Sequence, residues 1–574
     1  MRAPTLALLL MCLALLPLSP AQASNAPLET LAATTSCASL ASLDIEAIGG
    51  AGSRIRQATE QDEQGIAQCV VEGTLAPAIG FRIRLPVKTW TQRYLQIGCG
   101  GLCGNISGQV GAAGGCAPLA AGGFVQGATD MGHQGNDASF GDDAGLRRDF
   151  AYRAQHVTAL LAKSLIRAYY GRPQAYAYFS GCSDGGREAL MEAQRYPDDF
   201  DGIIAGAAAL NFGVQNGLYH AWQAMANTGP DGRAVLLASR LPVLHRAVLA
   251  QCDALDGQTD GLLADPRLCQ PDLAAIQCPA AQADTSACLS AAEIAVVRKL
   301  YDGPRDPQSG ERLTAGGPQP GSELQWAGVF VPMAADQRIF SNQIAEEALR
   351  HVLFETNPPA SFRLADLPFT RDTFARLART HALYGATNPD LARFAASGRK
   401  LILWHGWSDP HISPLNTIAY HEALKGQLGD TVVQGFERLY LLPGVSHCSG
   451  GEGPSELDLL TPMMNWVEQG IAPGAVLTTQ PDPARRNSFG QPGGAPGAKR
   501  TAGADGPPPG MMAPSTVRSP VQSRPVYPYP AVSRYSGRGD PLQAASQQAG
   551  APLFTGPLPA WIGSGLFALY RFQD

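Results

Sequence analysis

A serine in a tight glycine turn is the residue of this sequence best placed for nucleophilic chemistry. Ser183 lies within residues 181–185, GCSDG, which fit the pattern G-x-S-x-G. An aromatic run at 176–179 predicts a buried strand before the turn, and good helix formers at 189–193 predict a helix after it. Strand, sharp turn and helix form the context in which such a serine becomes an exposed nucleophile. The alternative is an ordinary strand-to-helix turn, because a chain with 64 glycines can match this pattern by chance.

A serine hydroxyl needs a general base, and the base needs an acid to orient it. Two later strands, predicted at 400–404 and 438–442, each lead into a loop with a candidate. The first loop carries Asp409 and the second carries His447, in the chain order Ser-Asp-His that is typical of this kind of sheet. We therefore expect Asp409 as the acid and His447 as the base. The local alternatives as the base are His405 and His411.

Two cysteines adjoin the predicted nucleophile and base. Cys182 directly precedes Ser183, and Cys448 directly follows His447. If the triad forms, these two backbones are already close, and a Cys182–Cys448 disulfide would join them. The alternative is two unrelated cysteines, each paired elsewhere.

Acyl transfer also needs hydrogen-bond donors for the developing oxyanion. The backbone N–H of Asp184, directly after the nucleophile, is one candidate. The second is expected from the glycine-rich segment 98–104, which follows a predicted strand at 93–97. Gly100 and Gly101 are the two candidates there, and a plain glycine-rich turn is the alternative.

The elements that must position these residues alternate between strands and helices. Short apolar strands broken by glycine fill residues 37–207, with a helical pattern from Phe150 to Tyr170. This predicts an α/β fold with a mostly parallel sheet. Helical patches, cysteines and Pro/Gly loops dominate between the two halves of that core, which predicts a large inserted lid. The expected segments are 24–207 and 396–479 for the core, 208–395 for the lid, 480–522 for a disordered Pro/Gly-rich insertion and 523–574 for a C-terminal segment.

The composition excludes several classes of function. The 574 residues are 45% hydrophobic and 16% charged, with a formal net charge of -6. Neither a basic patch for nucleic acid nor an acidic tail for a cationic partner is present. Residues 1–23 have a basic start, a short apolar run and an A-x-A site, which together predict a signal peptide. Its cleavage would make Ser24 the first residue of the mature protein. A retained anchor is the rival interpretation.

Export accounts for the cysteines, because disulfides persist in oxidising compartments. Removal of the signal peptide would leave eleven of the twelve cysteines, so at least one stays unpaired within the chain. Between Cys252 and Cys269, three carboxylates lie on a turn-rich loop: Asp253, Asp256 and Asp260. Hard oxygen ligands on such a loop suit Ca²⁺, although the spacing is not that of an EF-hand. A solvated acidic turn is an equal alternative on these residues alone.

Together these pieces resemble the tannase and feruloyl esterase family, over most of residues 37–545. The matching segments are GCSDGG at 181–186, EAQRYPDDFDGIIAGA at 192–207, ATDMGH at 128–133, WHGWSDP at 404–410, GVSHCSGGEGP at 444–454, SRPVYPYP at 523–530 and RYSGRGD at 534–540. The resemblance implies an α/β-hydrolase core, the triad Ser183, Asp409 and His447, the bridge Cys182–Cys448 and a lid that shapes the substrate pocket.

The resemblance also implies a structural calcium ion in the lid. Its ligands would be the three aspartates and the backbone carbonyls of Gln258 and Leu262. The implied disulfides are Cys37–Cys69, Cys252–Cys269 and Cys278–Cys288. One departure is Tyr527, which stands where family members often carry a bridged cysteine. Cys99 has no pairing to carry over, and Cys103–Cys116 is a provisional pair.

The expected function is that of a secreted or periplasmic serine esterase acting through an acyl-enzyme. The family implies a small aromatic ester as substrate, of a hydroxycinnamic, gallic or related benzoic acid. A terephthalate half-ester, or another small ester, is the enzymatic alternative. An alternative of another class is a non-catalytic binding protein on a hydrolase scaffold. No membrane span is expected, and the residues do not indicate an oligomeric state.

Overall fold

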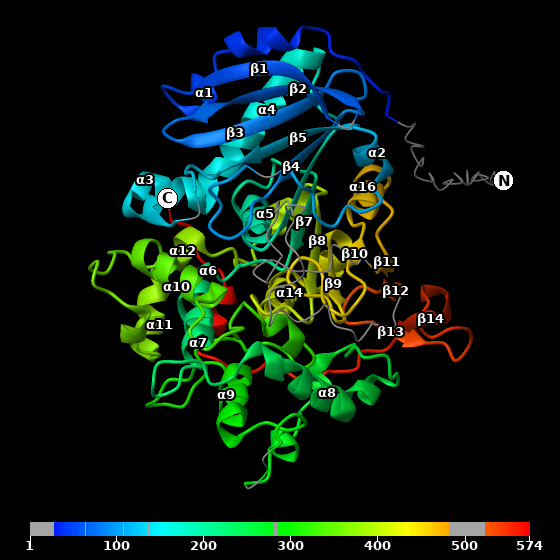
Figure 1. Cartoon of the computed structure of the whole chain (residues 1–574). Helices are drawn as coiled ribbons and strands as arrows, with labels where there is room; N and C mark the ends of the chain where they lie inside the picture. Colours follow the sequence, from blue (N-terminus) through cyan, green and yellow to red (C-terminus); the bar gives the residue numbers. More distant parts are fainter. Residues whose placement is uncertain are drawn as a thin grey trace, which may run out of the picture.

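The computed structural model describes residues 28–63, 65–106, 108–135, 137–280, 282, 284–480 and 523–573. The predicted signal peptide lies outside these residues. So does the predicted Pro/Gly-rich insertion, apart from Gln480. Figure 1 shows the whole chain, coloured along the sequence.

A nine-stranded sheet forms the centre of the part that the structure describes (Figure 1). Its strand order is β1-β2-β3-β5-β4-β6-β7-β8-β9. The strands are β1 (Arg54–Glu63), β2 (Ile66–Leu75), β3 (Ile79–Pro86), β4 (Arg93–Ile97), β5 (Phe124–Thr129), β6 (Tyr176–Cys182), β7 (Gly202–Gly206), β8 (Lys400–Gly406) and β9 (Glu437–Leu442). From β5 across to β9 neighbouring strands are parallel, whereas β1, β2, β3 and β5 pair antiparallel. The predicted α/β class with a mostly parallel sheet is confirmed.

Both faces of the sheet are covered, because successive side chains of a strand point to opposite sides. Tyr178 of β6 packs in a cluster with Trp404 and Met463, the last from α16 (Leu460–Gln469). Its neighbour Phe179 packs in the larger cluster on the other face, with Leu165 of α4. That face carries α4 (Ala154–Tyr170), α5 (Asp184–Arg195) and α14 (Pro414–Leu428). Shorter helices are α1 (Glu46–Gly49), α2 (Ala117–Ala120), α3 (Ala144–Arg148) and α15 (Asp430–Phe436).

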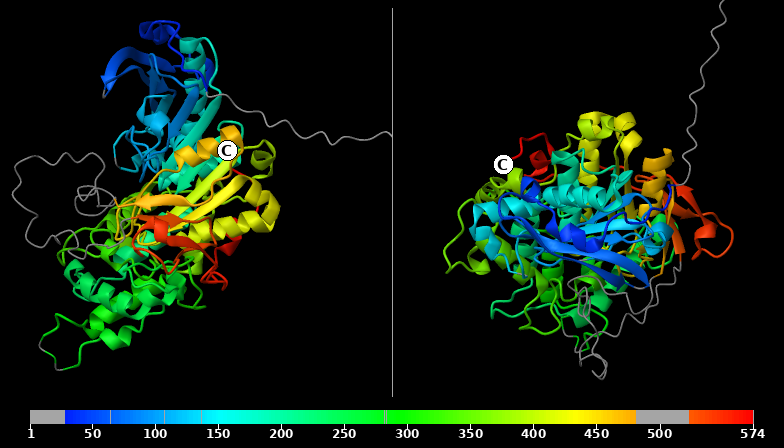
Figure 2. Two further views of the ribbon diagram at one scale, coloured as in Figure 1. Left: turned by 90° about the vertical axis from the view of Figure 1, so that its right-hand side faces the viewer. Right: turned by 90° about the horizontal axis from the view of Figure 1, so that it is seen from above.

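The chain between β7 and β8 is helical and loop-rich and gathers at one end of the sheet (green in Figures 1 and 2). It has a hydrophobic cluster of its own, centred on residues such as Leu244, Val297 and Trp326. Disulfides Cys252–Cys269 and Cys278–Cys288 close two of its loops. Its helices are α6 (Phe212–Val214), α7 (His220–Met225), α8 (Leu241–Cys252), α9 (Ala291–Asp302), α10 (Phe340–His351), α11 (Arg371–Ala378), α12 (His381–Tyr384) and α13 (Ala392–Ala396).

The C-terminal segment returns to the body of the molecule. Its first strand, β12 (Ser523–Val526), completes a three-stranded sheet with β10 (Glu456–Leu457) and β11 (Val476–Thr479). The next two strands, β13 (Val532–Tyr535) and β14 (Gln547–Gly550), form a two-stranded sheet. The tail then packs where the segment between β7 and β8 leads into β8. There the Gln573 N–H donates to the Ala382 carbonyl, and the Tyr570 hydroxyl donates to the Gly385 carbonyl. This packing explains the apolar, aromatic composition of 561–572.

Candidate active site

Ser183 occupies a strained turn between β6 and α5. Its backbone has φ 67° and ψ -123°, in a region that residues with a side chain seldom adopt. The flanking glycines are required by close contacts. A Cβ atom on Gly181 would lie 2.2 Å from the Gly185 carbonyl oxygen, and one on Gly185 would lie 2.8 Å from that of Cys99. The G-x-S-x-G pattern therefore has a steric cause in this fold.

The structure brings Ser183, His447 and Asp409 into one hydrogen-bonded chain. His447 Nε2 lies 2.8 Å from Ser183 Oγ, and His447 Nδ1 lies 2.7 Å from Asp409 Oδ2. Asp409 follows β8 and His447 follows β9, so neighbouring parallel strands deliver both to the same edge of the sheet. This geometry lets Nε2 accept the serine proton while Asp409 fixes the imidazole.

Asp409 is fully buried and remains a carboxylate. Burial alone would raise the pKa of Asp409, but the charge of His447 and hydrogen bonds from His405 and His447 hold it well below its usual range. The backbone N–H groups of His411 and Ile412 add bonds of 2.8 and 3.0 Å to Oδ1. A stable negative charge is thus placed behind the imidazole, where it stabilises the imidazolium that forms during proton transfer.

The cysteines beside the nucleophile and the base are bonded to each other. Cys182 and Cys448 form a disulfide with a Cα–Cα distance of 6.0 Å across a sequence separation of 266. The predicted pairs Cys37–Cys69, Cys252–Cys269 and Cys278–Cys288 are also present. All four predicted disulfides are therefore confirmed.

The provisional pair Cys103–Cys116 is wrong. Cys103 bonds to Cys99 instead, and Cys116 is a buried free thiol. Cys99 and Cys103 belong to the hydrophobic cluster on the α4 face of the sheet, whereas Cys116 belongs to the cluster on the α16 face. The sheet separates the two thiols that the provisional pair would join.

The predicted oxyanion donors lie around the start of α5. Asp184 is the first residue of that helix, where a backbone N–H has no partner within the helix. Gly100 and Gly101 lie in the turn between Cys99 and Cys103, and Gly101 has φ 67°. The choice between these two glycines as the second donor stays a prediction.

The three aspartates of the acidic loop are buried, with exposures of 8% for Asp253, 8% for Asp256 and 5% for Asp260. Each accepts backbone N–H bonds within the loop, such as Ala264 N–H to Asp256 Oδ2 at 2.9 Å. One cation is paired with them among the described residues, Arg524 with Asp260 at 3.0 Å. Their oxygens do not converge within 4.8 Å in this structure; the clusters that do are Cys99, Cys103 and Glu188, and His156, Glu192 and Asp199.

The donor set of the acidic loop nevertheless fits a hard divalent cation. Three buried like charges lie close in sequence, with one paired arginine against them. The Leu262 residue is 2% exposed, and neither its carbonyl nor that of Gln258 accepts a hydrogen bond from a described residue. Carboxylates together with unpartnered backbone carbonyls are the ligands that Ca²⁺ takes.

Two groups near the triad were not identified from the sequence in their observed roles. His405, considered there as an alternative base, donates to Asp409 from Nε2 at 3.1 Å and contacts Thr417 through Nδ1 at 2.7 Å. Arg187 forms a fully buried ion pair with Asp184 at 2.6 Å. The spacing Asp-x-x-Arg in the first turn of a helix is the sequence signal for that second pair.

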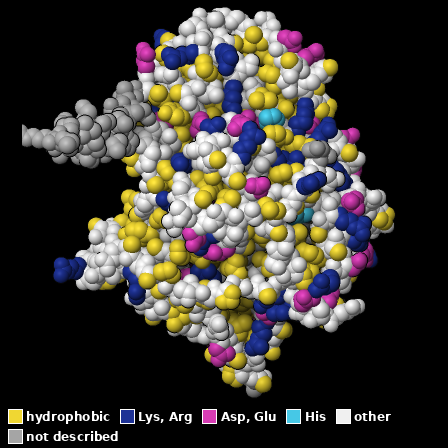
Figure 3. Space-filling model, turned by 180° about the vertical axis from the view of Figure 1, so that it is seen from behind, with side chains coloured by type: hydrophobic (Ala, Val, Ile, Leu, Met, Phe, Trp, Pro, Cys, Tyr) yellow, Lys and Arg dark blue, Asp and Glu magenta, His cyan; other side chains and the backbone are white. Residues whose placement is uncertain are grey.

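The surface carries charged side chains of both signs. Figure 3 shows acidic and basic side chains interspersed on the face opposite to that of Figure 1. Among the described residues, no helix is long and apolar enough to cross a membrane.

Comparison with known proteins gives concordant matches along the chain. The family model described as tannase and feruloyl esterase matches residues 64–549. A mono(2-hydroxyethyl) terephthalate hydrolase of Piscinibacter sakaiensis is 32% identical over 557 residues, covering 84% of this chain and 85% of its own. A probable feruloyl esterase B-2 of Aspergillus flavus is 32% identical, covering 71% of this chain and 78% of its own. The crystal structure of feruloyl esterase B from Aspergillus oryzae shares the fold, with a TM-score of 0.70, 24% identity and coverage of 88% of this chain and 100% of its own.

Proposed function

The chain belongs to the tannase and feruloyl esterase family and is a carboxylic ester hydrolase, and from that premise we propose that it cleaves esters of aromatic acids with Ser183 as the nucleophile. The observation that carries the proposal is the hydrogen-bonded chain from Ser183 through His447 to Asp409, with links of 2.8 and 2.7 Å. A strained, half-buried serine at the end of a strand, beside a buried imidazole–carboxylate pair, is the arrangement that acyl transfer requires.

The reaction follows from these positions. Ser183 Oγ attacks the ester carbonyl carbon as His447 Nε2 takes the hydroxyl proton, and the carbonyl oxygen becomes an oxyanion near the Asp184 N–H. The tetrahedral intermediate collapses, the C–O bond to the alcohol breaks, and His447 returns its proton to the leaving oxygen. A water molecule then attacks the acyl-enzyme with His447 again as base, which releases the acid and restores Ser183.

The aromatic acyl group is supported by the names of the relatives. Both a feruloyl esterase and a mono(2-hydroxyethyl) terephthalate hydrolase are, by name, enzymes for esters of aromatic acids. Hydroxycinnamic, gallic and related benzoic esters are therefore our first candidates. Terephthalate half-esters are the second, favoured by the 32% identity to the terephthalate enzyme over 84% of this chain.

The decisive experiment measures hydrolysis of methyl ferulate, methyl gallate and mono(2-hydroxyethyl) terephthalate by the wild type and by Ser183→Ala. We expect release of at least one of the aromatic acids by the wild type and none above a residual background by the variant. A fluorophosphonate probe should label the wild type and leave Ser183→Ala unlabelled. A variant as active as the wild type, after repurification, would refute Ser183 as the nucleophile.

We also propose a structural calcium ion bound by Asp253, Asp256, Asp260 and the carbonyls of Gln258 and Leu262. Support comes from the buried carboxylates, the unpartnered carbonyls and the Cys252–Cys269 bond that closes the loop. When bound, the ion would neutralise the aspartates and order the loop. The reaction steps need none of these five groups.

Removal of calcium should lower the melting temperature more than the rate of hydrolysis, because a ligand of the folded state alone adds stability by mass action. The measurement is a melting curve in excess chelator and after calcium is restored, with elemental analysis of the untreated protein. Asp256→Asn should melt lower and lose its response to calcium. Asp284→Asn, which changes an exposed lid aspartate, is the matched control. Identical melting curves with and without chelator, and no bound calcium, would reject the ion.

Export to an oxidising compartment is part of the same proposal. Five disulfides join described residues, a number that the reducing cytosol would not maintain. The predicted signal peptide supplies the route, and N-terminal sequencing of the exported protein should begin at Ser24.

A further inference from the structure

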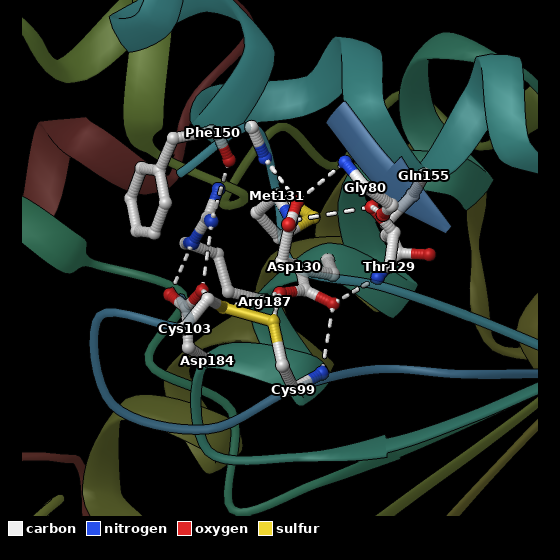
Figure 4. The surroundings of a disulfide bond; sticks show 12 residues. Gly80, Cys99, Cys103, Thr129, Asp130, Met131, Phe150, Gln155, Asp184 and Arg187 are labelled. Carbon is white, nitrogen blue, oxygen red and sulfur yellow. Dashed lines mark hydrogen bonds and ion pairs between the residues drawn. A yellow bond between two sulfur atoms is a disulfide. The ribbon is translucent and has the colours of Figure 1, made fainter. Parts of the chain in front are cut away.

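The glycine-rich segment 98–104, termed here the oxyanion loop, is closed on itself and pressed onto the nucleophile helix α5. Cys99 and Cys103 are joined at a sequence separation of 4, and the Cys103 N–H donates to the Gly100 carbonyl at 3.1 Å. Figure 4 shows the sulfur–sulfur bond beside Asp184 and Arg187 of that helix. A Cβ atom on Gly98 would lie 2.6 Å from Gly185 Cα. The start of the loop therefore touches the backbone two residues after the nucleophile.

Glu188, one turn further along α5, connects the helix to this loop. Its residue is 1% exposed. One carboxyl oxygen, Oε2, accepts from the Cys99 N–H at 3.2 Å and from Gln155 Nε2 at 2.5 Å. The other oxygen, Oε1, lies 2.9 Å from Cys99 Sγ and 3.2 Å from Cys103 Sγ. A single side chain thus contacts the loop backbone, its disulfide and, through Gln155, helix α4.

These contacts fit Glu188 as a neutral carboxylic acid. Burial, followed by the negative charge of Asp184, raises the pKa of Glu188 well above its usual range. A disulfide sulfur has no proton to donate, so the Glu188 O–H must be the donor at Oε1, while Oε2 is the acceptor. A glutamine amide offers the same pattern of one donor end and one acceptor oxygen. A leucine side chain of similar size offers neither.

Resting on the proposed function, we infer that Glu188 and the Cys99–Cys103 disulfide are positioning groups that hold the oxyanion loop against the nucleophile helix. Their effect is on the separation between the loop N–H groups and the carbonyl oxygen at Ser183. A misplacement of about 1 Å can cost on the order of 100-fold in rate. Because the oxyanion exists only after attack, loosening the loop lowers kcat and leaves KM nearly unchanged.

The test compares Glu188→Leu, Glu188→Gln and the double variant Cys99→Ser, Cys103→Ser. Hydrolysis of 4-nitrophenyl acetate gives kcat and KM. Phenylboronic acid, which adds to the serine as a tetrahedral analogue, and benzoate, a ground-state ligand, give two inhibition constants. We expect Glu188→Leu and the double variant to lose about 10-fold or more in kcat and in phenylboronic acid affinity. KM and benzoate affinity should stay within about twofold, and Glu188→Gln should keep at least about a third of the wild-type kcat.

The matched control is Cys278→Ser, Cys288→Ser, which opens a lid disulfide and should change none of these constants by more than about twofold. Unchanged kcat and boronate affinity in Glu188→Leu would overturn the inference, as would Glu188→Gln losing as much as Glu188→Leu. If the double cysteine variant fails to fold, the two Glu188 variants decide the question with the disulfide in place. A wild type that neither hydrolyses the ester nor reacts with a fluorophosphonate would refute the proposed function instead.

Discussion

A buried carboxylate that keeps its charge is the basis of the triad. Asp409 accepts hydrogen bonds from two histidines, His405 and His447, and from two backbone N–H groups. These donors and the charge of His447 outweigh the desolvation of the carboxyl, so its pKa stays well below the usual range. Loss of activity in mild acid, above about pH 4, is therefore not expected to come from protonation of Asp409.

His381 is a buried histidine outside the triad that should make stability depend on pH. Burial lowers its pKa from 6.5 to about 4, and Nε2 lies 2.8 Å from Thr387 Oγ1. Since the folded pKa is the lower one, this contribution to the free energy of unfolding is complete above pH 6.5. It is lost as the pH falls toward 4, by about 3 kcal/mol in total.

Unfolding by urea at pH 7, 5.5 and 4 measures this effect. In His381→Gln, the decrease in the free energy of unfolding between pH 7 and 4 should be smaller than in the wild type by about 3 kcal/mol. Equal decreases in the two proteins would show that His381 does not titrate in this range.

The Cys182–Cys448 disulfide joins the turn after β6 to the loop after β9. In the chain-entropy account, a loop of this length adds roughly 5–6 kcal/mol to stability. We expect the bond also to set the distance between Ser183 and His447. The double variant Cys182→Ala, Cys448→Ala should then lose most of its kcat at temperatures where it is still folded.

Activity per folded molecule, measured beside the melting curve, tests this expectation. The matched control is Cys37→Ala, Cys69→Ala, which removes the N-terminal disulfide and should lower the melting temperature alone. If the Cys182 and Cys448 variant also lost only stability, the bond would be a staple without influence on the geometry of the triad.

At the scale of the whole molecule, the C-terminal tail holds the segment between β7 and β8 to the core of the sheet. The Leu566 carbonyl accepts from Thr387 Oγ1, the Tyr570 carbonyl accepts from Asn388 Nδ2 at 2.8 Å, and the Gln573 carbonyl accepts from Arg195 Nη2 at 2.7 Å. Residues 381–388 lie near the end of the segment between β7 and β8, whereas Arg195 belongs to α5. The tail thus connects α5 of the core with the residues that lead from the segment between β7 and β8 into β8.

Truncation after Pro557 should therefore lower the melting temperature by roughly 5 °C or more, through lost hydrogen bonds and exposed apolar surface. Calorimetry of the truncated and full chains measures the difference. Arg571→Ala, which changes an exposed tail residue, is the control and should melt like the wild type. An unchanged melting temperature after truncation would mean that the tail contributes no stability.

The sequence by itself determined the features that depend on local backbone chemistry and on chain order. The turn at Ser183 needs small flanking residues for local steric reasons, so the pattern at 181–185 predicts the turn that is observed. Parallel strands bring their carboxyl ends to one edge, so strand order alone predicts that the loops carrying Asp409 and His447 meet there. The two carbonyl ligands expected in the acidic loop and three of the disulfide pairs came from family resemblance, because residue types and spacing along the chain specify neither.

Only the tertiary structure decided which groups meet across the two faces of the sheet. Cys103 pairs with Cys99 because Cys116 lies in the cluster on the opposite face. Glu188 became a contact of the oxyanion loop through packing between a loop and a helix far apart in the chain. His405 became a second donor to Asp409, four residues further on, because the loop after β8 turns back toward the end of that strand. Such contacts depend on side-chain direction and burial in three dimensions, and no spacing along a single chain encodes them.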